Sequence, residues 1–279
     1  MNKKPVVIFS VADDNNFPYA VMLFNSLTKF HSPKEIDMVL YTTEKRPDKL
    51  KQLPQGIKIE DLTPYLKQDP MFFYRQKPVL GEPLLDEYEL VLGMDSDQIV
   101  TGKLDYIFNT KDYDIGTVIN WNRTDPQYFG LIAFQGIMPP EYFNCGLVAM
   151  RSKKFAHHWK VLCFSPQFDR LQFKEQDLLN VLCYYGNYNV RCFDNTDGIA
   201  KYFAWHGLIA KGELIRAVMQ GDDILIPKGL GDTPFPPVDI QLKVIHTGGG
   251  NMPNKMNYKT WFSSEEVTKR IDYLVSPTK

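Results

Sequence analysis

The chain has 279 residues, and its 32 basic and 33 acidic side chains leave a formal net charge of −1. No run of lysines or arginines stands out, which argues against a nucleic-acid partner. No stretch is apolar over the roughly 18 to 20 residues that a membrane span needs, so no transmembrane segment is expected. The length suits one large domain, or two tightly joined halves, with a substantial core.

The start of the chain predicts a buried strand rather than a secretory signal. Residues 6–12 are apolar but few, and they run into two aspartates without a convincing cleavage site. The cysteines, at positions 145, 163, 183 and 192, form neither a C-x-x-C pair nor a dense disulfide pattern. We therefore expect reduced thiols, a cytoplasmic protein and no structural zinc site.

Strand-like and helix-like segments alternate over the first hundred residues. Hydrophobic periodicity predicts, in chain order, a strand over 6–11, a helix over 18–30, strands over 36–41 and 57–59, a helix over 77–85 and a strand over 90–94. This β-α-β order is typical of a mostly parallel sheet with helices on its faces.

After residue 102 the alternation is less regular. The pattern predicts strands over 115–119 and 146–150, helices over 155–164 and 175–184, and a short strand over 243–245. Residues 120–140 are expected to form a long loop, which is uncommon in a compact domain unless it is functional or mobile. The proline-rich residues 227–237 are expected to form a surface connection.

The strand over 90–94 is followed by two aspartates, Asp95 and Asp97, one residue apart. Side chains of an extended chain alternate in direction, so both acids point the same way, with backbones roughly 6 to 7 Å apart. Ligands of open α/β sheets bind beyond the carboxyl ends of the strands. The pair is therefore a candidate clamp for a divalent cation and a diphosphate, although a solvated strand end also explains this motif taken alone.

Further polar groups have two interpretations each. Asp13 and Asp14 could accept hydrogen bonds from a nucleobase, or they could cap the following helix. Arg75 and Lys77 could neutralise phosphates, or they could be solvated surface charges. His246 precedes three glycines that would let backbone N–H groups approach an anion, and it is either a third metal ligand or a structural histidine.

Two motifs of the second half are ambiguous when taken singly. Asn144 lies just before a predicted strand, where an ordinary turn explains it equally well. Glu175, Gln176 and Asp177 open a predicted helix, and acids in a first turn commonly complement the helix dipole. Lys255 lies a few residues after His246 and could reach phosphates bound near that histidine.

The order of these motifs resembles that of the retaining glycosyltransferases of family 8, which include glycogenin and bacterial lipopolysaccharide galactosyl- and glucosyltransferases. The resemblance runs from residue 6 to about 255, over residues 9–19, 25–27, 74–80, 91–97, 143–148, 175–180 and 245–250. It implies an α/β fold of the GT-A type, one domain over 1–279 around a mixed, mostly parallel sheet. A Rossmann-like nucleotide-sugar half would span about 1–104, an acceptor half about 105–250 and a C-terminal tail 251–279.

The resemblance also implies roles for single residues. Asp95, Asp97 and His246 would hold Mn²⁺ or Mg²⁺ against the diphosphate of a UDP-linked hexose, which is transferred to an unidentified acceptor hydroxyl. The residues implied to contact the donor are Ala12, Asp13, Asp14, Arg75, Lys77, Asp95, Ser96, Asn144, Gly248 and Lys255. Either Gln176 would steady an oxocarbenium-like centre during front-face attack, or Asp177 would act as a covalent nucleophile.

The chain departs from the family pattern at three places. Asn16 stands where an aromatic residue commonly follows, Glu175 replaces an aspartate, and the family's Lys-Pro-Trp is missing, which leaves Lys255 as its substitute. Two other functions stay open, a nucleotidyltransferase and a non-catalytic nucleotide- or glycan-binding module. The first would be expected to carry a glycine-rich basic loop after its first strand, and residues 10–16 contain no glycine.

Overall fold

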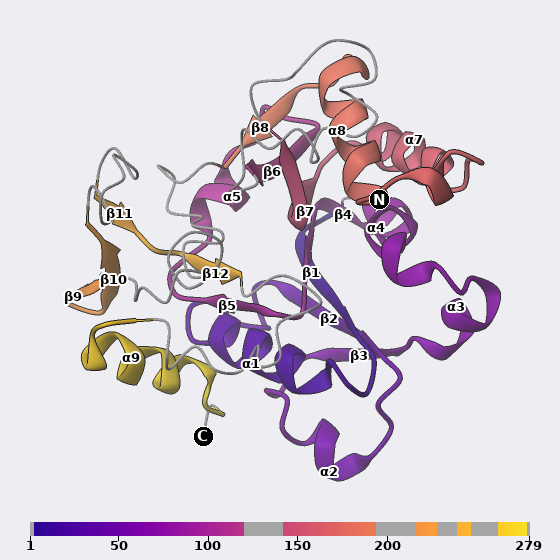
Figure 1. Cartoon of the computed structure of the whole chain (residues 1–279). Coiled ribbons are helices and arrows are strands. Elements are labelled where there is room, and N and C mark those ends of the chain that lie inside the picture. Colours follow the sequence, from indigo (N-terminus) through magenta and orange to yellow (C-terminus); the bar gives the residue numbers. More distant parts are fainter. Residues whose placement is uncertain (1–2, 120–141, 194–215, 228–238, 247–261, 278–279) are drawn as a thin grey trace.

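The computed structural model describes residues 3–119, 142–193, 216–227, 239–246 and 262–277. Its centre is a seven-stranded sheet with the order β3-β2-β1-β4-β7-β6-β8 (Figure 1). The strands are β1 (Lys4–Ala12), β2 (Asp37–Thr42), β3 (Lys58–Asp61), β4 (Tyr88–Met94), β6 (Ile115–Ile119), β7 (Phe143–Met150) and β8 (Val190–Cys192).

The direction of β7 determines which strand ends meet at the carboxyl edge of this sheet. Strands β3, β2, β1 and β4 are parallel, whereas β7 is antiparallel to both β4 and β6, and β8 is parallel to β6. Because β7 is reversed, its amino end lies beside the carboxyl end of β4, where the Asp95 N–H donates to the Gly146 carbonyl at 2.8 Å. The predicted mixed, mostly parallel sheet is confirmed.

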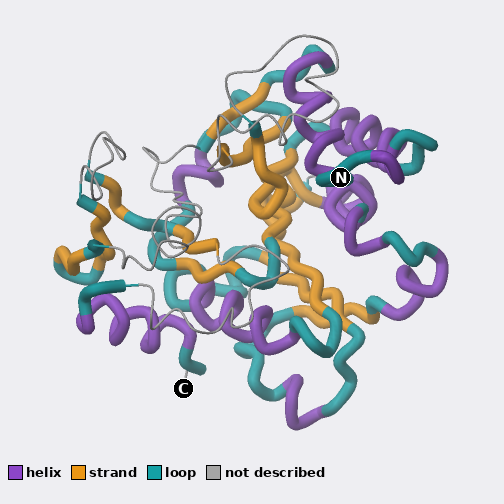
Figure 2. Tube along the Cα trace, viewed as in Figure 1, coloured by secondary structure: helices purple, strands orange, loops and turns teal. Residues whose placement is uncertain are grey.

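Helices cover both faces of the sheet, as Figures 1 and 2 show. The longer ones are α1 (Phe17–Thr28), α4 (Gln76–Glu87), α7 (Lys153–Cys163), α8 (Glu175–Tyr185) and α9 (Glu265–Val275). The short ones are α2 (Pro47–Leu50), α3 (Thr63–Gln68), α5 (Asp105–Asn109) and the 3-10 turns η1 (Phe72–Tyr74) and η3 (Phe168–Arg170). Ile8 packs in the core under α1, and its neighbours Val7 and Phe9 pack in the core under α4, α7 and α8, because strand side chains alternate between faces.

Two small sheets lie beside the main one. Strands β9 (Val218–Gln220), β10 (Asp223–Ile226) and β11 (Ile240–Gln241) form one, and β5 (Gln98–Val100) with β12 (Val244–His246) forms the other. The hydrophobic pattern did not indicate β5, β8 or β9 to β11. These strands are two to four residues long, too short for a clear period.

Residues 265–275, within the segment 251–279 that was assigned to a C-terminal tail, form helix α9. Val267, Ile271 and Leu274 are buried at helical spacing, and the first two pack in a core shared with β10 and β12. The Asn25 side-chain amide of α1 donates to the Val275 carbonyl at 3.1 Å. Helix α9 is therefore docked on α1.

The predicted elements of the first half agree with the structure to within a few residues. Three expected segments, 120–140, 228–237 and 247–250, lie outside the described residues. Within the described parts of the chain, no helix is both long and apolar enough to cross a bilayer.

Candidate functional site

Three metal-ligating side chains converge at the carboxyl end of β4. One ligand atom from each of Asp95, Asp97 and His246 lies within 4.8 Å of the others. Nε2 of His246 is 3.4 Å from Oδ2 of Asp95 and 3.2 Å from Oδ1 of Asp97. Two carboxylates and one imidazole form a donor set that suits Mn²⁺ or Mg²⁺ on the acids, and the nitrogen favours Mn²⁺ over Ca²⁺.

Strand pairing and one glycine hold His246 in this position. Strands β5 and β12 are antiparallel with His246 opposite Gln98, the residue after Asp97. On the other side the imidazole lies against β7, and a β-carbon on Gly146 would come within 2.3 Å of its Cε1. Only a glycine leaves room for the ring there, which accounts for the glycine that was noted in the motif around Asn144.

The carboxylates of Asp95 and Asp97 stabilise positive charge on the groups that face them. Burial opposes the charge on His246, but the facing carboxylates of Asp97 and Asp95 raise the imidazole pKa above its ordinary value. Burial also opposes ionisation of Asp95, yet Lys77 and His246 outweigh it and hold the pKa of this carboxyl well below its usual range. Asp95 is therefore ionised at neutral pH and available to a cation.

Lys77 is the buried counter-ion of Asp95. It lies in the first turn of α4 with 2% of its surface exposed, and its ammonium donates to Oδ1 of Asp95. Burial disfavours the charge, but Asp95 raises the lysine pKa above its ordinary value. Of the two interpretations of this residue, the solvated surface charge is excluded.

Arg75, by contrast, is held by groups of the protein scaffold. Its Nε donates to the Cys163 carbonyl at 2.8 Å and its Nη1 to Asp69 at 2.7 Å. The guanidinium lies 4.7 and 4.4 Å from the ring centres of Phe164 and Phe168. Residues two apart point to different sides of a helical turn, so Arg75 and Lys77 do not share a face. These contacts hold the Arg75 guanidinium against the protein scaffold, and its contact with the donor stays a prediction.

Side-chain amides join the start of β7 to the first turns of α8. Asn180 accepts from the Phe143 N–H at 2.7 Å and donates to the Phe143 carbonyl at 2.8 Å. Oε1 of Gln176 accepts from the Cys145 N–H at 3.0 Å, and Oδ1 of Asn144 accepts from the Gly146 N–H at 2.5 Å. Gln176 and Asn144 thus lie at the strand end that also borders Asp95. Asn180 was not singled out, although it shares a helix face with Gln176 four residues earlier.

Both carboxylate oxygens of Asp177 are engaged. Oδ1 accepts from the Tyr142 hydroxyl at 2.6 Å, and Oδ2 accepts from the Phe173 N–H at 2.9 Å. Burial, with 1% of the residue exposed, raises the pKa of Asp177. These contacts anchor the loop before α8 and hold the carboxylate in place.

Glu175 has a more specialised environment than a first-turn acid usually has. It is 8% exposed, burial raises its pKa to about 8, and one carboxyl oxygen lies 3.5 Å from the Cys145 thiol. A carboxyl of this pKa is mostly protonated at neutral pH and can donate a hydrogen bond. Lys174, directly before it, has a φ of 50°, a conformation that non-glycine residues rarely adopt.

The acids after β1 are tied into turns. Asp13 accepts from the backbone and side-chain amides of Asn16, both at 2.8 Å, and so stabilises the turn that leads into α1. The Thr43 hydroxyl donates to Asp14 at 2.5 Å and links the ends of β1 and β2. Ala12 is fully buried beside them.

Three other residues, Ser96, Gly248 and Lys255, were predicted to contact the donor. Ser96 lies between the two aspartates and is partly exposed. Gly248 and Lys255 lie outside the described residues.

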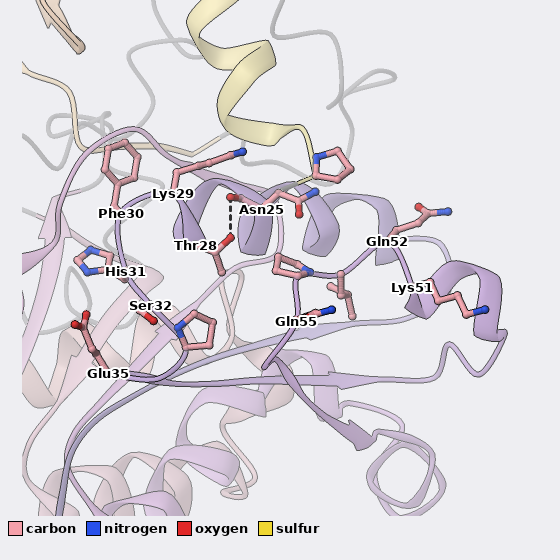
Figure 3. Close-up of a pocket in the computed structure, with 14 residues that line it drawn as sticks. Asn25, Thr28, Lys29, Phe30, His31, Ser32, Glu35, Lys51, Gln52 and Gln55 are labelled. Carbon is pink, nitrogen blue, oxygen red and sulfur yellow. Dashed lines mark hydrogen bonds between the residues drawn. The ribbon is translucent and has the colours of Figure 1, made fainter. Parts of the chain in front are cut away.

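A separate pocket of about 670 Å³ lies at the carboxyl end of helix α1 (Figure 3). Its walls come from the end of α1, the turn that follows, the loop before β3 and Pro277. Helix α1 runs back from the carboxyl end of β1, so this pocket is remote from the metal cluster. None of the predicted site residues lines it.

No protein-family model matches the sequence, and no curated protein matches it either. The structure is similar to that of the galactosyltransferase LgtC in complex with donor and acceptor sugar analogs, with a TM-score of 0.62, 18% identity and 98% of both chains covered. It is also similar to apo WbbM, a bifunctional glycosyltransferase, with a TM-score of 0.63, 13% identity, and 98% of this chain and 52% of that chain covered.

A third similar structure is the glycosyltransferase GlyE of Streptococcus pneumoniae, with a TM-score of 0.57, 16% identity, and 98% of this chain and 60% of that chain covered. The chain therefore spans little more than half the length of WbbM and GlyE. At these identities the likeness establishes the fold. The predicted GT-A architecture is confirmed.

Proposed function

We propose that this protein is a metal-dependent, retaining glycosyltransferase that moves a hexose from a UDP-linked donor, UDP-glucose or UDP-galactose, to an acceptor hydroxyl. The observation that carries the proposal is the convergence of Asp95, Asp97 and His246 at the carboxyl edge of a GT-A sheet. The acceptor is a hydroxyl of a glycan, a lipid-linked sugar or a protein.

The three ligands would hold Mn²⁺ or Mg²⁺, which supplies a Lewis acid against the charge that develops on the leaving diphosphate. Asp95 and Asp97 provide the negative charge that retains the cation. His246 fixes its position, because the imidazole is confined between β5 and β7. Preorganised groups of this kind usually contribute the largest share of catalysis.

We assign binding of the donor sugar to residues at the start of β7 and in the first turn of α8. Gln176 and Asn144 lie at this strand end, and Gln176 is assigned to the oxocarbenium-like centre. Glu175, whose pKa is raised to about 8 by burial, is assigned to donate a hydrogen bond to a sugar hydroxyl. The two hydrogen bonds on Asp177 support front-face attack over a covalent intermediate on that residue.

The nucleoside is assigned to the carboxyl ends of β1 and β2, where Ala12, Asp13 and Asp14 lie. Gly248 and Lys255 are assigned to the diphosphate on the sequence motif. In this arrangement residues up to about 104 bind the nucleotide, and residues 105–250 shape the acceptor side.

Mass spectrometry of the products from a panel of nucleotide sugars with Mn²⁺ tests the proposal. We expect UDP and free hexose from slow donor hydrolysis, and a glycosylated product once a suitable acceptor is supplied. Release of a nucleoside monophosphate would instead indicate nucleotidyl transfer. Binding of donors without any turnover would indicate a non-catalytic module.

A further inference from the structure

The Asp95 carboxylate contacts both the Lys77 ammonium and the His246 imidazole. Lys77 donates to Oδ1, and Nε2 of His246 lies 3.4 Å from Oδ2. Asp95 and Asp97 together bring two negative charges, of which the Lys77 ammonium neutralises one. A fixed positive charge thus lies against the first metal ligand before any metal binds.

Lys77 has little freedom to leave this position. Its side chain is 3% exposed, and α4 carries it against the sheet. Its stem passes over β4, where a β-carbon on Gly93 would lie 3.4 Å from Cγ of Lys77. The ammonium cannot swing into water, as a surface lysine would.

A divalent cation bound to Asp95 would lie close to this ammonium, because both would contact the same carboxylate. Like charges repel more strongly where water is excluded. A bound diphosphate changes the balance, because its oxygens carry negative charge and accept hydrogen bonds from an ammonium. The diphosphate then offsets the repulsion between the two cations.

We propose that Lys77 is a built-in counter-cation that makes metal binding depend on the nucleotide diphosphate, so that metal and donor bind together. This rests on the proposed function and adds a linkage between its two ligands. Such linkage is reciprocal, since the diphosphate must raise metal affinity by the same factor as the metal raises diphosphate affinity.

The test is a Mn²⁺ titration followed by electron paramagnetic resonance, with the Mn²⁺–UDP complex calibrated in protein-free samples. Wild type should bind Mn²⁺ at least about 10-fold more tightly with UDP than alone, and uridine should give no such gain. Lys77→Met should bind Mn²⁺ alone about 10-fold more tightly than wild type, and UDP should then raise Mn²⁺ affinity by a smaller factor than it does in wild type. Lys77→Arg, which keeps the charge, should behave as wild type.

Lys153→Met is the matched control, because Lys153 also pairs with an aspartate, Asp86 at 2.6 Å, but on the surface. It should leave both affinities unchanged. If Lys77→Met bound Mn²⁺ alone no more tightly than wild type, the proposal would be overturned, since a merely structural lysine would weaken the site when removed. If Lys77→Met does not fold, a wild type that binds Mn²⁺ equally well with UDP and with uridine overturns the proposal.

The two proposals fail in different ways. If Asp97→Asn left Mn²⁺ binding and donor turnover intact, the proposed function would fail. If Asp97→Asn abolished both while Lys77→Met left Mn²⁺ affinity unchanged, only the linkage would fail.

Discussion

The imidazole of His246 lies so close to the backbone of Gly146 that a β-carbon there would come within 2.3 Å of Cε1 and 2.7 Å of Nδ1. The two residues belong to different sheets, since Gly146 is in β7 of the main sheet and His246 is in the small β5–β12 sheet. The backbone carbonyl of Gly146 also accepts from the Asp95 N–H. A single glycine therefore contacts two of the three residues that we propose as metal ligands.

The first prediction is that Gly146→Ala displaces His246 and weakens the metal site without unfolding the protein. Substitution of a group that orients a metal ligand typically lowers metal affinity by about 10- to 100-fold. We expect Gly146→Ala to lower Mn²⁺ affinity by about that factor. Mn²⁺ titration and circular dichroism measure the two effects. In a His246→Ala background, Gly146→Ala should cost less, because the clash with the imidazole is gone and only the 2.8 Å approach to Oδ1 of Asn144 remains. An equal loss in both backgrounds would contradict this explanation.

The second prediction is that turnover depends on the cation held by the acids. A chelator should abolish donor hydrolysis, and Mn²⁺ should restore it better than Ca²⁺. Asp97→Asn keeps the side-chain volume but removes a charge, and we expect activity to fall by about 100-fold or more while the melting temperature is kept. Asp86→Asn, on the exposed Lys153 pair, is the control that should retain activity. An Asp97→Asn variant that unfolds would show that the acids are structural.

Much of the first half could be predicted from the sequence because its signals are local. The strand that ends at Met94 is a continuous apolar run, and Asp95 and Asp97 follow it directly. The alternation of strands with helices then fixes a parallel sheet and places these acids at its carboxyl edge. His246 is distant in sequence, and only the order of the motifs linked it to them.

The remaining features depend on contacts that no local pattern records. Hydrophobic spacing does not determine which side chains at the start of α4 point into the protein. It therefore could not show that Lys77 is buried against Asp95 while Arg75 is bonded to the Cys163 carbonyl and Asp69. The acid Glu175 resembles any first-turn carboxylate until its burial is known. Helix α9 has an amphipathic pattern that was overlooked in a segment treated as a tail, although Val267, Ile271 and Leu274 carry it.

The third prediction concerns stability against pH and rests on Glu175. Its carboxyl has a pKa raised by burial to about 8, against 4.5 when exposed. Between these two values the folded state holds a proton that the unfolded state has lost. The free energy of unfolding should therefore fall as pH rises through this window, by at most about 1.4 kcal/mol per unit, and level off above it.

Glu175→Gln removes this titration and should gain stability relative to wild type as pH rises from about 5 to 8. Urea unfolding at several pH values measures the difference. Glu266→Gln is the control, because Glu266 is exposed on α9 and its substitution should give a constant difference. A pH-independent difference for Glu175→Gln would mean that the carboxyl is ionised in the folded protein.

The fourth prediction is that UDP binds better than other nucleoside diphosphates. With Mn²⁺ present, UDP should raise the melting temperature more than GDP or ADP, because a ligand that binds only the folded state stabilises it by about 2.7 kcal/mol at 100 times its Kd. Asp13 and Asp14 at the end of β1 are the groups assigned to the base. Equal shifts for the three nucleotides would remove the uridine assignment and leave the metal site untouched.

The last prediction is stereochemical. Asp177 accepts hydrogen bonds on both carboxylate oxygens, from Tyr142 at 2.6 Å and from the Phe173 N–H at 2.9 Å, and such bonds lower the nucleophilicity of a carboxylate and hold it in place. Gln176 is a poor nucleophile, so its amide serves to stabilise positive charge at the anomeric carbon rather than to bond to it. We therefore expect front-face attack with retention, and Gln176→Ala should keep measurable activity and the same anomeric configuration.

Two measurements decide the route. Mass spectrometry of the enzyme quenched during turnover should find no hexose on Asp177, and NMR of the anomeric proton should show an α-linked product from an α-linked donor. A hexose on Asp177 would establish the covalent route, which also retains configuration through two displacements. A β-linked product would contradict both routes and the proposed retaining reaction, because neither a front-face nor a double displacement inverts the anomeric carbon.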